Sequence, residues 1–278
     1  MTDKTESYKK SRLISNNTLA MAVNAGFTLI ELSVVLVIIG LIIGGILTGT
    51  DLIASSTIRA QVAQIEGYRS AVKQFESKYD ALPGDINPSK AAKFGFTTRS
   101  GADHHGDEDG RLYGCSASDA IGCETSLFWS DLSKAKMIKE SFTAASDALE
   151  VAANADEVTN YIPEGKLDGT YIMVNYTNSS GGGGYATLNT NVFHLMFMDD
   201  IILGNPTTHP WVKPQDAYSI DLKMDDGKPH SGSVVSSPGN VPSPPANGVC
   251  VTDEPGNPYN TSTSTFANYG SCYMKIFF

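Results

Sequence analysis

The sequence predicts an α+β protein in which one long N-terminal helix, partly apolar and partly amphipathic, packs on a small antiparallel β-sheet domain with loop insertions. Three observations lead to this prediction. An almost unbroken apolar run extends from Phe27 to Leu47, and apolar residues then recur at helical spacing as far as Tyr79. Short β-branched and aromatic segments follow, separated by stretches rich in Gly, Ser and Pro.

The first 26 residues form a polar, basic leader. Four Lys or Arg residues against two acidic ones give this leader a net charge of +2. Positive residues before a membrane span stay on the cytoplasmic side, so the remaining chain is expected to cross the membrane. An ordinary secretory signal is cleaved after its apolar stretch, whereas here the small residue Gly26 precedes that stretch. We therefore expect residues 1–26 to be removed. The alternative, an uncleaved signal anchor, does not account for Glu31.

The apolar run from Phe27 to Leu47 has 21 residues, which is enough to cross a bilayer as a helix. Glu31 lies inside this run. A charged side chain within a membrane is costly, so its presence indicates a functional site. Gly40 and Gly44 form a small-xxx-small pattern that lets helices approach closely in lipid. The same glycines could instead loosen the helix, and the sequence leaves both interpretations open.

An amphipathic pattern continues the helix beyond the apolar run. Its stripe consists of Ile58, Val62, Ile65, Val72, Phe75 and Tyr79. Pro83-Gly84 then ends the helix. A helix over Phe27–Tyr79 would be about 80 Å long at 1.5 Å per residue. We accordingly divide the chain after the leader into a membrane or filament-core half of the helix (27–50), an amphipathic half (51–82) and an exported domain (83–278).

The sequence of the exported domain predicts a mixture of helices, strands and loops. Helices are predicted at Thr125–Ile138 and Pro214–Met224, and Asn191–Leu203 is apolar enough for a buried helix, with a strand left open. Strands are predicted at Thr170–Tyr176, Tyr185–Leu188 and Cys272–Phe278. Loops are predicted at residues 84–126, 179–184 and 231–245.

Net charge limits the binding partners that are expected, and cysteine content predicts disulfides. The whole chain has a formal charge of −10, so removing the +2 leader leaves −12. This acidic balance, with no basic cluster along the sequence, argues against nucleic acid and anionic lipid surfaces. The four cysteines suggest two disulfides on the exported side. Three pairings are possible, and Cys115–Cys123 with Cys250–Cys272 is favoured because each pair closes a short loop.

Acidic residues before Gly110 raise the question of a metal. Asp107-x-Asp109-Gly110 resembles part of a calcium loop, and Asp103 lies nearby. The full spacing of a calcium-binding EF-hand is absent, so we favour a solvated acidic turn and expect no cofactor. Calcium held by Asp103, Asp107 and Asp109 is the alternative. Asp225-Asp226-Gly227 is expected to end a helix, with calcium again as the alternative.

The segment Gly26–Gly40, GFTLIELSVVLVIIG, resembles the N-terminal signal of type IV pilins and of type II secretion pseudopilins. Three later segments are similar to bacterial proteins of the type II secretion or prepilin type: Tyr79–Asp85, Phe128–Leu132 and Ile220–Pro229. The resemblance implies a type IV pilin-like fold.

The resemblance also implies roles for three residues. A prepilin peptidase would cleave between Gly26 and Phe27, and Phe27 would become the N-methylated first residue. Glu31 would direct assembly by pairing with the α-amino group of Phe27 on a neighbouring subunit. The alternative is that Glu31 merely reaches the cytoplasmic interface of the membrane.

The implied partners are other pilin or pseudopilin subunits, in homo- or hetero-polymers, the peptidase, and an inner-membrane assembly platform. The implied location is a single pass through the bacterial inner membrane with a periplasmic C-terminal domain. After assembly, the subunit would lie in a periplasm-spanning or surface filament.

Three classes of function follow. The preferred one is a structural subunit of a type II secretion pseudopilus, which is not itself an enzyme. The alternative is a major or minor subunit of a type IV pilus, including one that displays an adhesive or ligand-binding domain. An anchored periplasmic enzyme is disfavoured because the sequence carries no catalytic constellation such as a nucleophile elbow.

Overall fold

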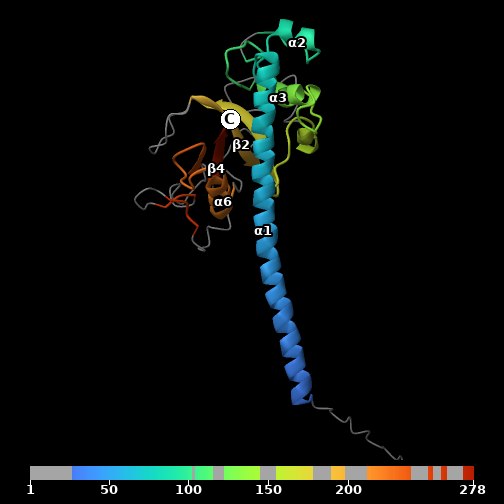
Figure 1. Ribbon diagram of the computed structural model, residues 1–278, viewed down its shortest axis with the longest axis vertical. Helices are drawn as coiled ribbons and strands as arrows, with labels where there is room; N and C mark the ends of the chain where they lie inside the picture. Colours follow the sequence, from blue (N-terminus) through green and yellow to red (C-terminus); the bar gives the residue numbers. More distant parts are fainter. Residues whose placement is uncertain are drawn as a thin grey trace, which may run out of the picture. The chain divides into compact units, whose positions relative to one another are not determined.

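The computed structural model describes residues 27–101, 104–114, 122–144, 155–177, 189–197, 212–238, 250–252, 258–261 and 272–278. The chain divides into two compact units, one ending at Thr50 and the other comprising Asp51–Phe278. The helices in the described residues are α1 (Leu29–Tyr79), α2 (Pro88–Phe94), α3 (Cys123–Lys134), the 3₁₀ helix η1 (Ala155–Asn160) and α6 (Pro214–Met224) (Figure 1). The strands are β1 (Thr170–Thr177), β2 (Thr190–Phe197), β3 (Val234–Pro238) and β4 (Cys272–Phe277). A long N-terminal helix with a small antiparallel sheet confirms the predicted α+β class.

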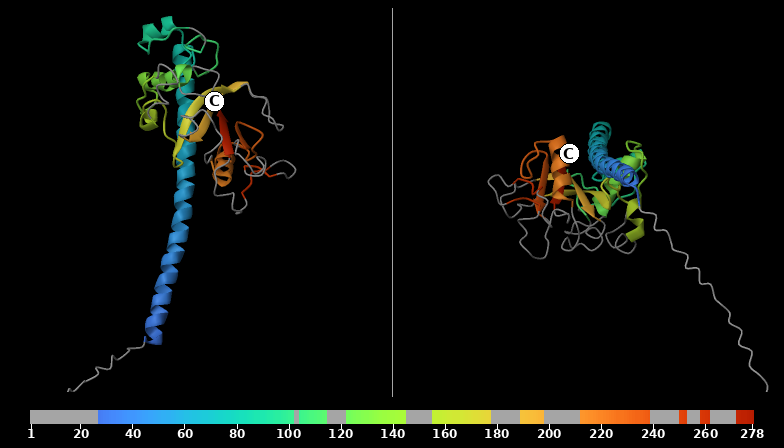
Figure 2. Two further views of the ribbon diagram at one scale, coloured as in Figure 1. Left: turned by 180° about the vertical axis from the view of Figure 1, so that it is seen from behind. Right: turned by 90° about the horizontal axis from the view of Figure 1, so that it is seen from below.

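The second part of α1 is the central element of the unit Asp51–Phe278. The predicted apolar stripe is buried at Ile58, Ile65, Val72 and Phe75, and Tyr68 fills the one gap in its spacing. Figures 1 and 2 show α6 and β4 on one side of this part of α1 and α3 on the other. The helix ends at Tyr79 because the next residue adopts a left-handed backbone, with φ 51°.

The sheet has the order β1-β2-β4-β3, and all its neighbouring strands are antiparallel. Phe193 of β2 lies on the face toward α1, with its ring centroid 6.3 Å from that of Tyr68 and 6.0 Å from that of Trp129. Along β4, residues alternate between buried and half-buried. The alternation is the pattern expected of a strand with one face toward a core.

The structure decides one open prediction for the exported domain and corrects another. Asn191–Leu203 was apolar enough for a buried helix, with a strand left open, and residues 190–197 form the strand β2, between β1 and β4. Residues 198–203 lie outside the described residues. Because a central strand is buried on both faces, its apolar run does not alternate and cannot be told from a buried helix by periodicity. The loop predicted at 231–245 contains β3, a strand whose serines gave no β signal but whose backbone pairs with β4.

Other elements follow the sequence more closely. α6 spans the predicted residues, with Pro in its first turn. α3 begins two residues before the predicted start and ends at Lys134, short of Ile138. The predicted loop at 84–126 holds the unpredicted helix α2, for which Asn87 is the N-cap and Pro88 the first residue. The predicted turn and strand at 179–188 lie outside the described residues.

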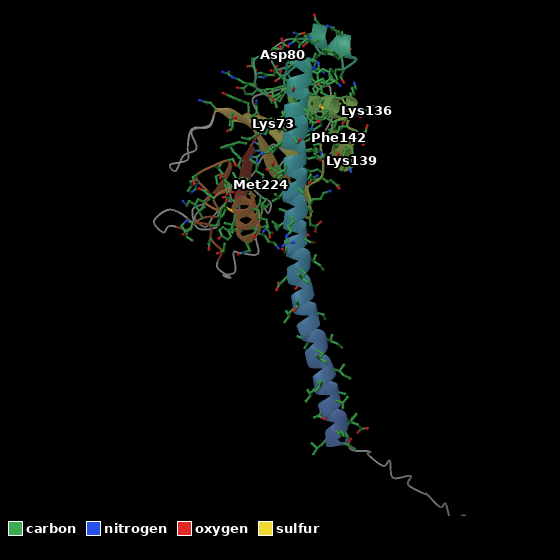
Figure 3. All side chains as sticks on the ribbon, in the orientation of Figure 1. Lys73, Asp80, Lys136, Lys139, Phe142 and Met224 are labelled. Carbon is green, nitrogen blue, oxygen red and sulfur yellow. A yellow bond between two sulfur atoms is a disulfide. The ribbon has the colours of Figure 1, made fainter. Side chains whose placement is uncertain are left out.

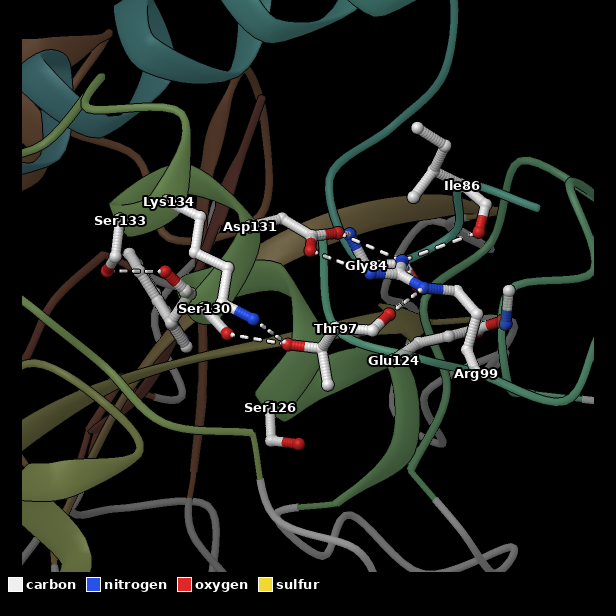
Figure 4. A network of polar contacts seen from close by, with 12 residues as sticks. Gly84, Ile86, Thr97, Arg99, Glu124, Ser126, Ser130, Asp131, Ser133 and Lys134 are labelled. Carbon is white, nitrogen blue, oxygen red and sulfur yellow. Dashed lines mark hydrogen bonds and ion pairs between the residues drawn. The ribbon is translucent and has the colours of Figure 1, made fainter. Parts of the chain in front are cut away.

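A buried ion pair joins α3 to the segment that follows α2. Arg99 and Asp131 are both fully buried, and their side chains are 2.7 Å apart at Nη2 and Oδ1 and 3.0 Å apart at Nη1 and Oδ2 (Figure 4). The Arg99 guanidinium also donates to the carbonyl oxygens of Gly84, Ile86 and Thr97. Asp131 in turn accepts from the backbone N–H of Gly84 at 2.9 Å. The network therefore fixes the chain where it leaves α1.

Gly84 has no room for a side chain at this crossing. Its φ is +87°, and a Cβ atom would lie 2.5 Å from the carbonyl oxygen of Glu124. The segments Tyr79–Asp85 and Phe128–Leu132 thus meet through Gly84 and Asp131.

Cys250 and Cys272 form a disulfide that ties the start of β4 to an adjacent segment. This is one of the two pairs favoured from the sequence. Cys123 is also disulfide-bonded, and Cys115 lies outside the described residues.

Replacing Asp131 by Ala is predicted to destabilise the folded chain by about 3–5 kcal/mol, because it leaves the Arg99 charge buried and unpaired. Urea unfolding of the chain in detergent measures this change. The double variant Arg99→Met/Asp131→Leu is the control, and it should recover much of the loss because no lone charge is then buried. Equal destabilisation by the single and double variants would contradict this role for the ion pair.

Candidate functional site

The residues singled out from the sequence lie at the start of α1, in the unit that ends at Thr50. Gly26 lies outside the described residues. Phe27 and Thr28 precede the helix, and Glu31 lies in its first turn. Phe27 is 86% exposed.

Glu31 and Thr28 form a reciprocal capping box. The Glu31 carboxylate oxygen Oε2 accepts from the backbone N–H of Thr28 at 2.9 Å and from its hydroxyl at 2.8 Å. The backbone N–H of Glu31 donates to the Thr28 hydroxyl at 3.2 Å. A threonine followed three residues later by glutamate is the sequence signature of this motif, which satisfies N–H groups that the first helical turn leaves unpaired.

The capping box gives Glu31 a defined orientation. Both bonds that Glu31 accepts go to Oε2, so within the described residues Oε1 receives no hydrogen bond. The carboxylate also lies at the helix N-terminus, where the helix dipole favours negative charge. One oxygen thus holds the start of the helix and the other remains open to a further donor. Glu31 alone was singled out from the sequence, although the T-x-x-E spacing from Thr28 to Glu31 indicates this cap.

The apolar part of the helix that follows is exposed within its own unit. Its large apolar side chains from Leu29 to Leu47 are 46–90% exposed. Among the described residues, α1 is the one helix long and apolar enough to cross a membrane, with a mean hydropathy of 2.7 over its best 18-residue window. A Cβ atom at Gly40, Gly44 or Gly45 would meet nothing within 4 Å. Among the described residues of this unit, no side chain packs against these glycines.

Residues 21–47 match the family described as the prokaryotic N-terminal methylation motif. The chain carries the prepilin-type signal of type IV pilins and pseudopilins. No curated protein and no solved structure matches the chain. The matched residues include Gly26, Phe27, Thr28 and Glu31. The prepilin-type signal supports a pilin-like substrate of a prepilin peptidase and a membrane-anchored protein.

A second candidate lies in the loop at 104–114. Asp107 and Asp109 lie with Asp85 so that one oxygen of each falls within 4.8 Å of the others, while Asp103 lies outside the described residues. Asp85 accepts from the backbone N–H groups of Glu108 at 2.6 Å and Gly110 at 2.8 Å. Asp107 and Asp109 likewise accept backbone N–H groups of their own loop. The carboxylates thus organise the turn, and Asp85 was not singled out from the sequence.

Glu124, in the first turn of α3, also accepts hydrogen bonds from the loop at 104–114. Its two carboxylate oxygens accept from the backbone N–H groups of Gly106 at 2.9 Å and Tyr113 at 3.1 Å. Burial raises the pKa of Glu124 to about 8 and that of Asp85 to about 6, although the accepted hydrogen bonds oppose both changes. The loop is therefore anchored by two carboxyl groups that resist ionisation.

The turn after α6 is built in the same way. Asp221 accepts from the Tyr259 hydroxyl at 2.8 Å and from the backbone N–H of Gly227 at 3.2 Å. Burial raises the pKa of Asp221 to about 6. Asp226 accepts from the Ser231 hydroxyl at 2.7 Å. The helix ends at this turn, as predicted.

Replacing Thr28 by Val is predicted to open the first turn of α1, because Val keeps the shape of Thr but lacks the hydroxyl that bonds Glu31. Backbone amides of residues 28–31 should then exchange with solvent faster, as measured by NMR of the mature chain in detergent micelles. Thr28→Ser keeps the hydroxyl and should leave exchange unchanged. Identical exchange in all three proteins would contradict the capping box.

Stability is predicted to fall as the pH rises from about 7 to about 9, above the range in which the lowered pKa of the buried His194 acts in the opposite direction. The folded pKa values of Asp85, Asp221 and Glu124 lie above their unfolded values, so the folded state holds these protons more tightly. The stabilisation is present below the unfolded values near 4 and is lost as the pH passes about 6 and about 8. Each pKa unit corresponds to about 1.4 kcal/mol.

Thermal unfolding at pH 7, 8 and 9 measures this pH dependence. Glu124→Gln should flatten the decrease between pH 7 and pH 9, because it removes the group with the higher pKa. A melting temperature that rises over this range would show that the assignment of these groups is wrong.

Proposed function

We propose that this chain is a structural subunit processed by a prepilin peptidase, anchored in the inner membrane and assembled into a type II secretion pseudopilus. The observation that carries the proposal is an exposed apolar helix that begins at Leu29, two residues after Phe27, with the Thr28–Glu31 cap. Such a surface requires lipid or other subunits around it. The globular domain would face the periplasm, since the basic leader would stay in the cytoplasm.

The proposed chemistry of assembly follows from Glu31. Cleavage after Gly26 creates an α-amino group on Phe27, and its N-methylation leaves it able to carry a positive charge. In lipid, the lone carboxylate of Glu31 and a lone ammonium group each carry a large desolvation cost. Pairing the open oxygen of Glu31 with the Phe27 amine of a neighbouring subunit removes both costs and sets the axial register between subunits.

The preference for a secretion pseudopilus rests on the segments Tyr79–Asp85, Phe128–Leu132 and Ile220–Pro229, which are similar to type II secretion and prepilin-type proteins. The partners proposed are other pilin-like subunits, the prepilin peptidase and the inner-membrane assembly platform. Long surface filaments seen by electron microscopy would instead favour the type IV pilus alternative.

Glu31→Ala is predicted to leave cleavage largely intact and to reduce incorporation into filaments at least about tenfold. In the peptidase reaction the altered side chain lies beyond the cut, whereas in assembly the Phe27 amine of the neighbour loses its partner. The measurements are the N-terminal mass and the sedimentable filament fraction in cells that carry the assembly machinery. Asp51→Ala, an exposed acid on the same helix, is the control and should assemble normally. Filaments of normal yield from Glu31→Ala would refute the register mechanism.

We further propose that the subunit needs no metal cofactor. Asp85, Asp107 and Asp109 already accept backbone N–H groups, which supports a loop that closes without a cation. Calorimetric titration of the chain with calcium should therefore give no saturable heat. A saturable heat that disappears in Asp107→Asn would assign calcium to this loop instead.

A further inference from the structure

A polar groove runs along the second part of α1, within the unit Asp51–Phe278. It has a volume of about 780 Å³ and lies between α1 and the segment that follows α3. Its charged lining consists of Glu66, Arg69, Lys73, Lys78 and Lys136. Figure 3 labels Lys73 on α1 and Lys136 on the neighbouring segment.

Three of these charges are not matched within the described residues. Arg69 and Glu66 form an ion pair of 2.7 Å, and Arg69 also donates to the carbonyl oxygen of Phe277. Lys73, Lys78 and Lys136 are exposed, and no ion pair joins them to any carboxylate in the described ranges. Lys73 acts electrostatically on Glu76 without pairing with it. The groove therefore carries a net charge of about three positive units.

Helical geometry explains the shape of this site. At about 100° per residue, Lys73 and Lys78 lie roughly 140° apart around α1. Ser70, Gln74 and Ser77 fall between them and line the groove with short or uncharged side chains. Lys136 comes from a distant part of the sequence. The sequence analysis found no basic cluster because these lysines gather only in the folded chain.

We propose that this groove receives an acidic surface segment of a second copy of this chain. This inference rests on the proposed function, assembly into a filament. The chain after Gly26 has a net charge of −12, so neighbouring domains in a filament repel each other. A groove of opposite sign gives an acidic segment of the neighbour a place where contact is favourable and specifies how the two copies are oriented.

A second copy is a better occupant than a dissolved polyanion. Nucleic acid would have to approach the whole acidic surface from solution. A neighbouring subunit is already held nearby by its apolar helix, which gives its acidic segments a high effective concentration at the groove. The groove is also polar, unlike the apolar pockets that bind most small ligands. Exposed ion pairs are individually weak and screened by salt, so the contact orients subunits rather than driving assembly.

Zero-length cross-linking of filaments tests this contact directly. Mature full-length chain is prepared with ¹⁴N and with ¹⁵N, and mixed filaments are treated with a carbodiimide, which joins a lysine amine to a carboxylate that it touches. Mass spectrometry should find Lys73, Lys78 or Lys136 linked to an Asp or Glu of the other isotope. Links from these lysines only to their own chain, or none at all, would overturn the proposal.

Charge reversal provides the second test. Lys73→Glu/Lys78→Glu/Lys136→Glu should reduce filament yield at least about tenfold. The matched control Lys213→Glu/Lys223→Glu/Lys228→Glu makes the same change in net charge on exposed lysines around α6 and should stay within about twofold of the wild type. Thermal unfolding verifies that both variants fold. Equal yields of the two variants would overturn the proposal.

The outcomes separate this inference from the proposed function. Wild-type filaments whose subunits begin at Phe27 but whose groove lysines do not cross-link between copies overturn the docking alone. Absence of filaments from the wild type overturns the proposed function, and the docking falls with it. Binding of duplex DNA to filaments that is lost in the groove variant would replace the second copy with a nucleic acid.

Discussion

Burial of one apolar stripe on α1 is the interaction on which the domain depends. Ile65 and Phe75 are fully buried, and Tyr68 of the same stripe brings together α3 and the sheet through its contacts with Trp129 and Phe193. Removing such aromatic and aliphatic contacts typically costs several kcal/mol each. In the described residues the sheet has four strands, and its buried side chains share one core with those of α1.

The same helix meets a different requirement in its first part. From Leu29 to Leu47 its large apolar residues are exposed within their own unit, and under the proposed function lipid or other subunits would cover them. Isolated polar groups are costly in such surroundings. The capping box of Thr28 and Glu31 satisfies the start of the helix within the chain itself and still leaves one carboxylate oxygen open. The cap and the proposed pairing with a neighbour are therefore compatible functions of one side chain.

The sequence was sufficient to predict those elements that depend on local periodicity or on a specific local motif. It predicted α1, α6, β1 and β4, and it singled out Glu31. It failed where the outcome depends on contacts distant in sequence. β2 is a strand because it pairs with β1 on one side and β4 on the other. Asp85 stabilises the loop at 104–114 because it accepts backbone N–H groups from Glu108 and Gly110, which are distant in sequence. Thr28 is a different case, because its T-x-x-E spacing was visible but was not used.

The claim at the centre of this account is that Gly26 and Phe27 mark a processed N-terminus rather than the start of a signal anchor. Intact mass and N-terminal sequencing of the membrane-extracted protein, from cells with and without a prepilin peptidase, test it most directly. The account predicts a chain that begins at methylated Phe27 when the peptidase is present and at Met1 when it is absent. A chain that begins at Met1 in both strains would contradict it.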